Sequence, residues 1–235
     1  MKSSYSFISL LCAPLILTIA ACSSNEIGES KDVAPETVYQ QYSVGFKEGD
    51  KNATVYAQFR FAGDDGTTLV LTKPGNIQLD GVEIPVDSSE FEGAFYKKFP
   101  SVDNLQDEHI LIFTGFDQRK YENRFSLNIF KLANLPETAD RTQPIAIQFE
   151  PLQLGPNDRI ELHPIDSDSS FTVSYTAADS VPLLCIPVAE LKRQKGNQLK
   201  MEATFYRHIP LQQATTEGGK LEIEYVSKPF TITLQ

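Results

Sequence analysis

Apolar and polar residues alternate strictly through most of the chain after residue 36, and this pattern limits the fold to half-buried β-strands. In residues 54–61 the apolar set Val55, Ala57, Phe59 and Phe61 would face a core. Equally clean alternation is found at Arg159–Leu162, Leu199–Ala203, Leu221–Tyr225 and Phe230–Leu234. Only residues 187–196 could form a turn or two of helix, so an all-β fold is expected.

Turn-forming residues separate these segments, at "GDDGT" (63–67), Asp80-Gly81 and "EGG" (217–219). Short strands with such turns every 8–12 residues or so are typical of antiparallel β-sandwiches of about 100 residues. We expect two tandem immunoglobulin-like sandwiches, over residues 37–132 and 144–235. The polar, proline-containing segment 133–143 is the expected linker.

Two stretches resemble immunoglobulin-like modules from an uncharacterised family of bacterial envelope proteins. They are "NATVYAQFRFAGDDGTTLVLTKPGNIQLDGVEI" (52–84) and "HILIFTGFDQRKYENRFSLNI" (109–129). In such modules an alternating strand leads through a Gly-rich turn to "TTLVL" and then to a hairpin with Asp-Gly at its tip. The resemblance implies the sandwich fold and carries no activity.

The N-terminus reads as a signal peptide over residues 1–21. Lys2 precedes an apolar run from 7 to 20, which as a helix would span only about 21 Å of a bilayer core of about 30 Å. The run ends at Ile19-Ala20-Ala21-Cys22, which resembles the lipobox of bacterial lipoproteins. The alternative is an ordinary secretory signal with a cysteine near its cleavage site.

The lipobox resemblance implies that Cys22 carries a thioether-linked diacylglycerol and an N-acyl chain, and no other cofactor is expected. Because Ser23 rather than Asp follows Cys22, it also implies an outer-membrane protein of the bacterial cell envelope. Of three cysteines, Cys12 leaves with the signal and Cys22 is alkylated. Cys185 is then left without a disulfide partner, and its apolar neighbours predict a buried, inert thiol.

Residues 22–36 are polar and are expected to form a flexible tether behind the lipidated cysteine. The formal net charge of the chain is −10, with no basic run. Such a charge argues against binding nucleic acid and against electrostatic adhesion to anionic lipid. The lipid is therefore the expected contact with the membrane.

Catalytic and metal-binding motifs are scarce in the sequence. It contains no G-x-S-x-G, H-E-x-x-H or C-x-x-C motif, and His109, His163 and His208 lie far apart. His163 and His208 fall on the outward sides of their strands. Asp166 and Asp168, within "DSDSS", are weak calcium candidates, because Asp and Ser also dominate turns for conformational reasons.

The least regular stretch, residues 88–108, holds four aromatic side chains, Phe91, Phe95, Tyr96 and Phe99. They either cap one end of the first sandwich or form an exposed loop that contacts a partner or a glycan. The charged segment 117–124, with Tyr121, is a second candidate loop or an ordinary hairpin connection.

Together these patterns favour a lipid-anchored, non-catalytic binding or structural module that meets another envelope protein through sandwich surfaces. A carbohydrate-binding module, or an enzyme or accessory domain acting on envelope polymers, is the alternative. Aromatic rings lying flat on an exposed face would favour glycan binding. A cleft with two carboxylates about 5 to 10 Å apart would favour glycoside hydrolysis. The oligomeric state and the membrane face are left open.

Overall fold

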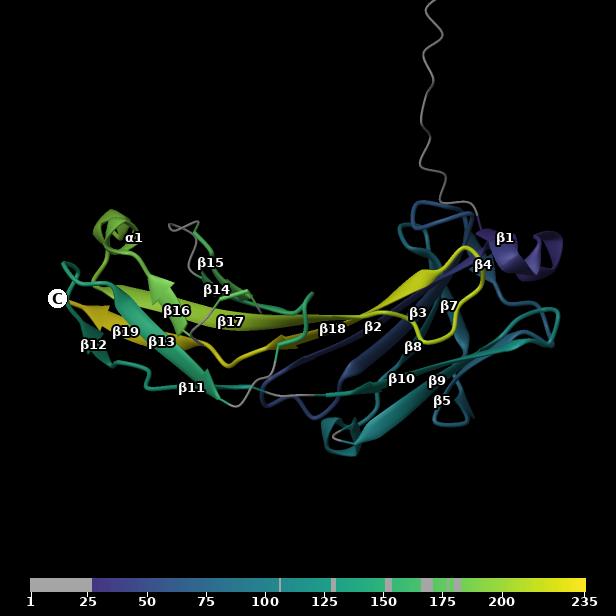
Figure 1. Ribbon diagram of the computed structural model, residues 1–235, viewed down its shortest axis with the longest axis horizontal. Helices are drawn as coiled ribbons and strands as arrows, with labels where there is room; N and C mark the ends of the chain where they lie inside the picture. The colour runs from purple at the N-terminus through teal and green to yellow at the C-terminus, as the bar shows by residue number, and fades with distance from the viewer. Residues whose placement is uncertain are drawn as a thin grey trace, which may run out of the picture.

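The computed structural model describes residues 27–105, 107–127, 130–150, 154–165, 171–176, 178–179 and 183–235. In these residues the chain is all-β, as the alternation predicts, with one short helix, α1 (Val188–Arg193), inside the segment where a helical turn was expected. The molecule is elongated, and β1 and the C-terminus lie at opposite ends of its long axis (Figure 1).

Ten strands belong to the N-terminal half: β1 (Ile27–Glu29), β2 (Val38–Lys47), β3 (Thr54–Phe61), β4 (Thr68–Val70), β5 (Asn76–Leu79), β6 (Val82–Glu83), β7 (Val86–Ser89), β8 (Gly93–Lys98), β9 (Glu108–Thr114) and β10 (Lys120–Ser126). Three 3-10 turns accompany them, at Ser30–Asp32, Pro35–Thr37 and Val102–Leu105. The C-terminal half contains β11 (Lys131–Ala133), β12 (Thr138–Ala139), β13 (Ile145–Glu150), β14 (Arg159–Pro164), β15 (Val173–Thr176), β16 (Leu183–Ile186), β17 (Gln198–Ile209), β18 (Gly219–Val226) and β19 (Phe230–Leu234).

One 12-stranded sheet runs through both halves, with the central order β1-β4-β3-β2-β18-β17-β14-β15. Its continuity depends on a parallel pairing of β2 with β18, in register from Gly219 opposite Gln40 to Val226 opposite Lys47. We call this the main sheet. A four-stranded sheet (β10-β9-β5-β6) and a three-stranded sheet (β11-β13-β16) complete the fold.

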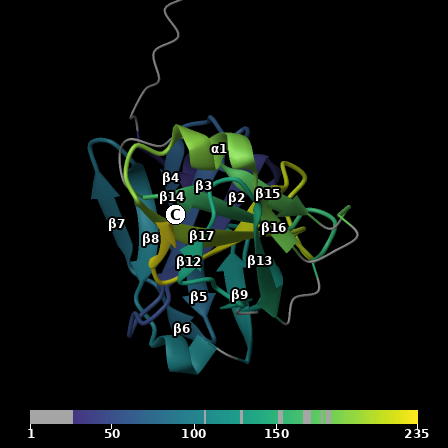
Figure 2. The same cartoon turned by 90° about the vertical axis from the view of Figure 1, so that its left-hand side faces the viewer.

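The two smaller sheets cover the same face of the main sheet, one in each half. Phe59 of β3 packs on Phe113 of β9 at 4.5 Å between ring centroids. Between the halves, Phe130 contacts Phe205 and Tyr225 of the main sheet edge to face. The buried residues therefore form one continuous core, and the outer face of the main sheet is left to solvent; Figure 2 looks along this two-layered body from its C-terminal end.

A β-bulge bends the long strand that β18 and β19 form along β17. Val226 lies opposite Thr204 and Phe230 opposite Met201, so four steps on one strand match three on the other. The extra residue is accommodated at Ser227, whose hydroxyl accepts a hydrogen bond from the Ala203 N–H at 2.9 Å. The bulge lets β18 pair with β2 of the N-terminal half while β19, its continuation, pairs with β12 of the C-terminal half.

The loop between β17 and β18 covers the edge of β10. Gln212 and Gln213 accept hydrogen bonds from the backbone N–H groups of Arg124 and Glu122, at 2.6 and 3.0 Å. Buried Asn123 donates to the Gln213 carbonyl at 2.9 Å. Side chains from the C-terminal half therefore pair with backbone N–H groups at the edge of β10 that would otherwise be exposed without partners.

The expected flexible tether, residues 22–36, is wrong for residues 27–36. Here β1 pairs in parallel with β4, and the hydroxyl of buried Ser30 accepts a hydrogen bond from the Thr72 N–H at 2.9 Å. The composition is polar, but residues 27–29 pair in the sheet, and Ser30–Asp32 and Pro35–Thr37 form 3-10 turns. Residues 22–26, with Cys22, lie outside the described residues.

The expected linker, residues 133–143, is not a free connection between two bodies. Thr138 and Ala139 form β12 and pair in parallel with β19, and the Arg141 N–H donates to the Gln235 carbonyl at 3.1 Å. Because the main sheet also crosses between the halves, this segment does not separate two independent sheets. Alternation locates strands, but it does not reveal which distant strand each one joins.

Candidate functional site

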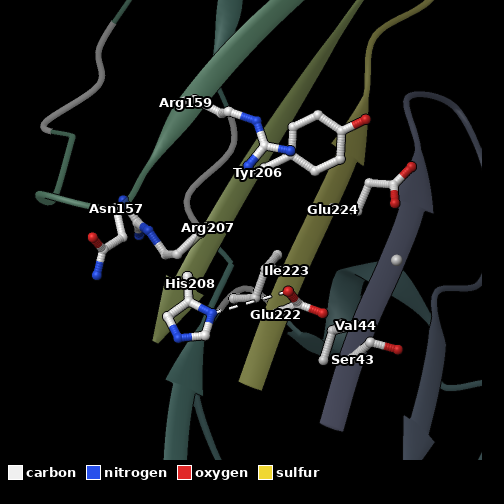
Figure 3. A pocket seen from close by; sticks show the side chains of 11 residues that line it. Ser43, Val44, Asn157, Arg159, Tyr206, Arg207, His208, Glu222, Ile223 and Glu224 are labelled. Atoms are coloured by element: carbon white, nitrogen blue, oxygen red, sulfur yellow. Dashed lines mark ion pairs between the residues drawn. The ribbon is translucent and has the colours of Figure 1, made fainter. Parts of the chain in front are cut away.

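A pocket of about 270 Å³ opens on the outer face of the main sheet where β2, β18, β17 and β14 lie side by side. We call it the sheet-face pocket. It is lined by Ser43, Val44, Gly45, Asn157, Arg159, Tyr206, Arg207, His208, Glu222, Ile223 and Glu224 (Figure 3).

Strand register brings the polar lining together. Gly45, Glu224, Tyr206 and Arg159 lie opposite one another on four successive strands, and alternation turns all of them outward. A side-chain carbon at Gly45 would meet no atom within 4 Å, so the glycine leaves open space beside Glu224. Gly inside a strand often marks close approach by a ligand or another backbone.

One wall of the pocket is a stacked pair. The Arg159 guanidinium lies 4.2 Å from the centre of the Tyr206 ring, and its Nε donates to Glu161 at 2.8 Å. Burial, followed by the negative charges of Glu224 and Glu161, raises the pKa of the Tyr206 hydroxyl above its usual value. Tyr206 therefore stays neutral and can donate or accept a hydrogen bond at physiological pH.

The opposite wall carries two carboxylates with different surroundings. Glu222 is 4.0 Å from His208 Nδ1 and 3.9 Å from Lys220 Nζ, both at the limit of an ion pair. Glu224 makes no ion pair with any residue of the described chain. The pocket thus contains a negative charge beside an unfilled space, a combination suited to a positively charged or hydrogen-bond-donating group.

The pocket floor is held by a buried ion pair. Asp158, which is 4 % exposed, accepts hydrogen bonds from Arg207 Nε at 2.9 Å and from the Gly155 N–H at 2.8 Å. Arg207 Nη2 lies 2.8 Å from the same carboxylate oxygen. The three contacts fix the segment that begins β14 and so position Asn157 and Arg159 at the pocket rim.

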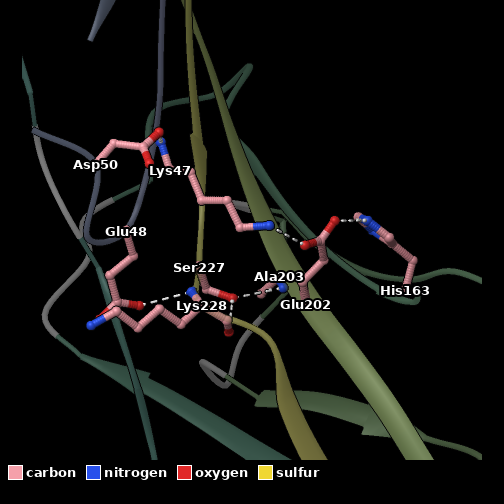
Figure 4. Close-up of polar contacts among 8 residues, drawn as sticks. All are labelled: Lys47, Glu48, Asp50, His163, Glu202, Ala203, Ser227 and Lys228. Carbon is pink, nitrogen blue, oxygen red and sulfur yellow. Dashed lines mark hydrogen bonds and ion pairs between the residues drawn. The ribbon is translucent and has the colours of Figure 1, made fainter. Parts of the chain in front are cut away.

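A second polar group, which we call the Glu202 cluster, lies on the same sheet face nearer the bulge (Figure 4). Glu202 accepts from Lys47 Nζ at 3.0 Å with one oxygen and lies 3.4 Å from His163 Nε2 with the other. Lys47 belongs to the N-terminal half and His163 to the C-terminal half. The Glu202 carboxylate thus contacts side chains from both halves of the chain and links them.

The aromatic residues predicted as a binding loop are divided by the structure. Phe91 is 89 % and Phe99 62 % exposed, whereas Phe95 and Tyr96 are 5 % and 4 % exposed. Phe95 stacks on Tyr56, and the Tyr96 hydroxyl accepts a hydrogen bond from the Leu71 N–H at 2.7 Å. Phe95 and Tyr96 therefore belong to β8 and its packing rather than to an exposed loop.

Tyr121 is half-buried and stacks on Phe113 at 5.5 Å, within β10 rather than in a loop. Cys185 is exposed, because Leu184 and Ile186 point into the core on either side of it in β16; the expected buried thiol is wrong. His109 is buried, with Nδ1 2.7 Å from Asp80 Oδ2. His208 alone of the three histidines lines the sheet-face pocket.

The calcium candidates Asp166 and Asp168 lie outside the described residues. The part of the chain that the structure describes contains no cluster of three or more His, Cys, Asp or Glu side chains that could hold a metal ion. Within the described ranges, no helix combines the length and apolar character needed to span a membrane.

Sequence reasoning did not identify the sheet-face pocket. The alternation at Leu221–Tyr225 placed Glu222 and Glu224 on a strand. It could not show that β2 pairs with β18, whose residues lie 179 positions later in the sequence. The one local signal was Gly45, a glycine inside the alternating run of β2. No family model matches the chain, and no curated protein matches it.

Proposed function

We propose that the protein is a lipid-anchored, non-catalytic binding module of the bacterial cell envelope, which presents its outer sheet face to another envelope protein. The lipobox-like sequence Ile19-Ala20-Ala21-Cys22 supports the diacylglycerol and N-acyl anchor, and Ser23 supports outer-membrane sorting. We further propose that residues 37–132 and 144–235 are two immunoglobulin-like sandwiches fused through the main sheet.

The observation that carries the binding role is Glu224 beside the open space over Gly45. A carboxylate in this position can receive a lysine or arginine side chain from a partner, with Tyr206 and Ser43 within the same pocket as hydrogen-bonding groups. The formal net charge of −10 adds long-range attraction for a basic surface. We therefore infer that the partner is a protein with an exposed basic side chain.

Glycan binding at the same pocket is the second candidate, because planar Arg, Asn, Glu and His side chains line it. The argument against glycan binding is that Tyr206 is the only phenol ring in this lining and that the Arg159 guanidinium already lies on one of its faces. A sugar would need a free ring face on which to stack.

Glycoside hydrolysis fits the geometry less well. Glu222 and Glu224 lie two residues apart on β18, about 7 Å by strand rise, which is within the spacing for such chemistry. However, they project from one strand in the same direction, whereas a glycosidase places its carboxyl groups on either side of the bond it cleaves. The Glu222 side chain is also 50 % exposed, unlike a desolvated catalytic acid.

Site-specific photocrosslinking in cells expressing the lipidated protein tests the proposal. A benzophenone amino acid replaces Ser43 in the pocket or, as the control, Thr231 on the outer face of β19. We expect one discrete protein adduct from position 43, weakened by Glu224→Gln and by added salt. Mass spectrometry identifies the partner and the crosslinked peptide.

Equal adducts from both positions, or an adduct at position 43 that Glu224→Gln and salt leave unchanged, would contradict a pocket-directed protein partner. Chemical-shift changes of Tyr206 on adding purified envelope polysaccharide, without a protein adduct, would instead establish the glycan alternative. Release of sugar fragments would establish hydrolysis.

A further inference from the structure

The end of the molecule that carries β1 exposes several large apolar side chains. Ile27 begins β1, Phe61 ends β3, and Phe91 occupies the turn between β7 and β8; all three are exposed. Phe91, at 89 %, is the most exposed of the large hydrophobic residues in the described chain. Large apolar side chains that are exposed together at one end of a molecule mark an interaction surface.

These residues lie around β1 on two sides. Ile27 borders a hollow of about 510 Å³ together with Ser88, Ser89 and Glu90, which immediately precede Phe91. On the other side, Phe61 borders a hollow of about 210 Å³ with Gly28 and Glu29 of β1. The apolar residues therefore form one rim around β1, which we call the β1 rim.

The turn that carries Phe91 is fixed to the strand beside β1. The Ala94 N–H donates to Thr68 Oγ1 at 3.0 Å, and Thr68 pairs with Ile27 across the β1–β4 ladder. Gly93 has a φ of +71° and packs against the Thr68 side chain. Phe91 is thus held at the same end of the molecule as Ile27.

The proposed lipid anchor lies very close to this end. Cys22 is five residues before Ile27, and five residues of fully extended chain reach at most about 17 Å. Anchored acyl chains would hold the β1 rim near the bilayer surface at all times, so that even a weak interfacial preference is satisfied.

We propose that the β1 rim, with Phe91 as its tip, contacts the headgroup region of the bilayer and orients the elongated body with its C-terminal end away from the membrane. This inference rests on the proposed anchor at Cys22. The acidic neighbour Glu92 would be repelled by an anionic surface, so the partner surface is zwitterionic lipid.

The sequence contains no tryptophan, so one substitution gives a single fluorescent probe. Phe91→Trp places the probe on the β1 rim, and Phe99→Trp provides an exposed control at the far end of β8. Each lipidated variant is reconstituted into phosphatidylcholine–phosphatidylethanolamine vesicles, with and without brominated lipids as quenchers. A Cys22→Ser version of each serves as the unanchored reference.

In vesicles we expect the Phe91→Trp emission to shift to the blue and to be quenched by brominated lipid at least about twofold more than that of Phe99→Trp. Adding phosphatidylglycerol should reduce this difference. Matching thermal melts of both variants establish that the probes leave the fold intact.

Flotation separates failure of the inference from failure of the anchor. If the lipidated protein floats with the vesicles but both probes report equal, solvent-exposed environments, the β1-rim contact is wrong and the anchor stands. If the protein fails to float, the anchor at Cys22 is wrong, and the inference falls with it.

Discussion

The sheet-face pocket and the Glu202 cluster lie on the same face of the same strands, but they differ in how their charges are used. In the Glu202 cluster, both oxygens of one carboxylate have cationic or ionisable partners, one from each half of the chain. In the pocket, Glu224 has no ion pair within the described chain and borders the space over Gly45. A polar cluster that completes itself stabilises the fold, whereas one left incomplete is available to a partner.

The largest effect on stability is expected beneath the pocket, at the buried partner of Arg207. Asp158→Ala removes a carboxylate that is 4 % exposed and that contacts two nitrogens of the Arg207 guanidinium, Nε at 2.9 Å and Nη2 at 2.8 Å. We expect a loss of about 3 kcal/mol in the free energy of unfolding, measured by urea denaturation.

Glu83→Ala is the matched control, because Glu83 forms a solvent-exposed ion pair with Lys73. It should cost less than about 0.5 kcal/mol. Similar losses for the two variants would show that the Asp158 pair does not secure the pocket floor.

The second effect compares the two clusters directly. Glu202→Gln removes the charge that holds Lys47 and His163, and we expect it to destabilise the fold by about 1 kcal/mol. Glu224→Gln in the pocket removes no ion pair and should change the free energy of unfolding by less than about 0.3 kcal/mol. If Glu224→Gln is the more destabilising variant in denaturant titrations, the proposed difference between the Glu202 cluster and the sheet-face pocket is wrong.

The smallest effect is on the ionisation of Tyr206. Burial and then the Glu224 charge raise the pKa of this phenol, so Glu224→Gln should lower that pKa towards 10.0. Because the folded-state pKa lies above the unfolded value, the stabilisation by neutral Tyr206 is complete below pH 10 and is lost as the pH rises through the folded pKa. The loss of stability above pH 10 should therefore be less steep in the variant.

Titration of the Tyr206 ring carbons by NMR measures this pKa in the wild-type protein and in Glu224→Gln. Glu222→Gln is the control, since the raised pKa of Tyr206 comes from burial, then Glu224 and Glu161, rather than from Glu222. An unchanged Tyr206 pKa in Glu224→Gln would mean that the two groups do not share a pocket in solution.

Much of the strand pattern could be predicted from the sequence. The segment chosen for its alternation, residues 54–61, is β3, and Val55, Ala57 and Phe59 are buried as expected. Two residues depart from the alternation for identifiable reasons. Phe61 is exposed because it ends the strand, and Gln58 is buried because its amide donates to the carbonyls of Glu92 and Ala94.

Pairing between distant strands could not be predicted, and the candidate site depends on it. Period-2 patterning fixes which way Glu224 and Tyr206 point, but nothing local specifies that β2 joins β18 in parallel. The exposed-loop alternative for residues 88–108 is not met at Tyr96 for a related reason. Crowded aromatic residues suggest a surface, yet Tyr96 is buried in β8, and its hydroxyl accepts a hydrogen bond from the N–H of Leu71, just after β4.

The most direct test of the account is Gly45→Val, measured for both stability and partner crosslinking from position 43. Because a side chain at this position meets no atom within 4 Å and valine favours strands, the variant should be more stable by about 0.5–1 kcal/mol. The same side chain fills the space beside Glu224, so the crosslinked adduct should disappear. A stabilised variant that still gives the full adduct would contradict the claim that the sheet-face pocket receives the partner.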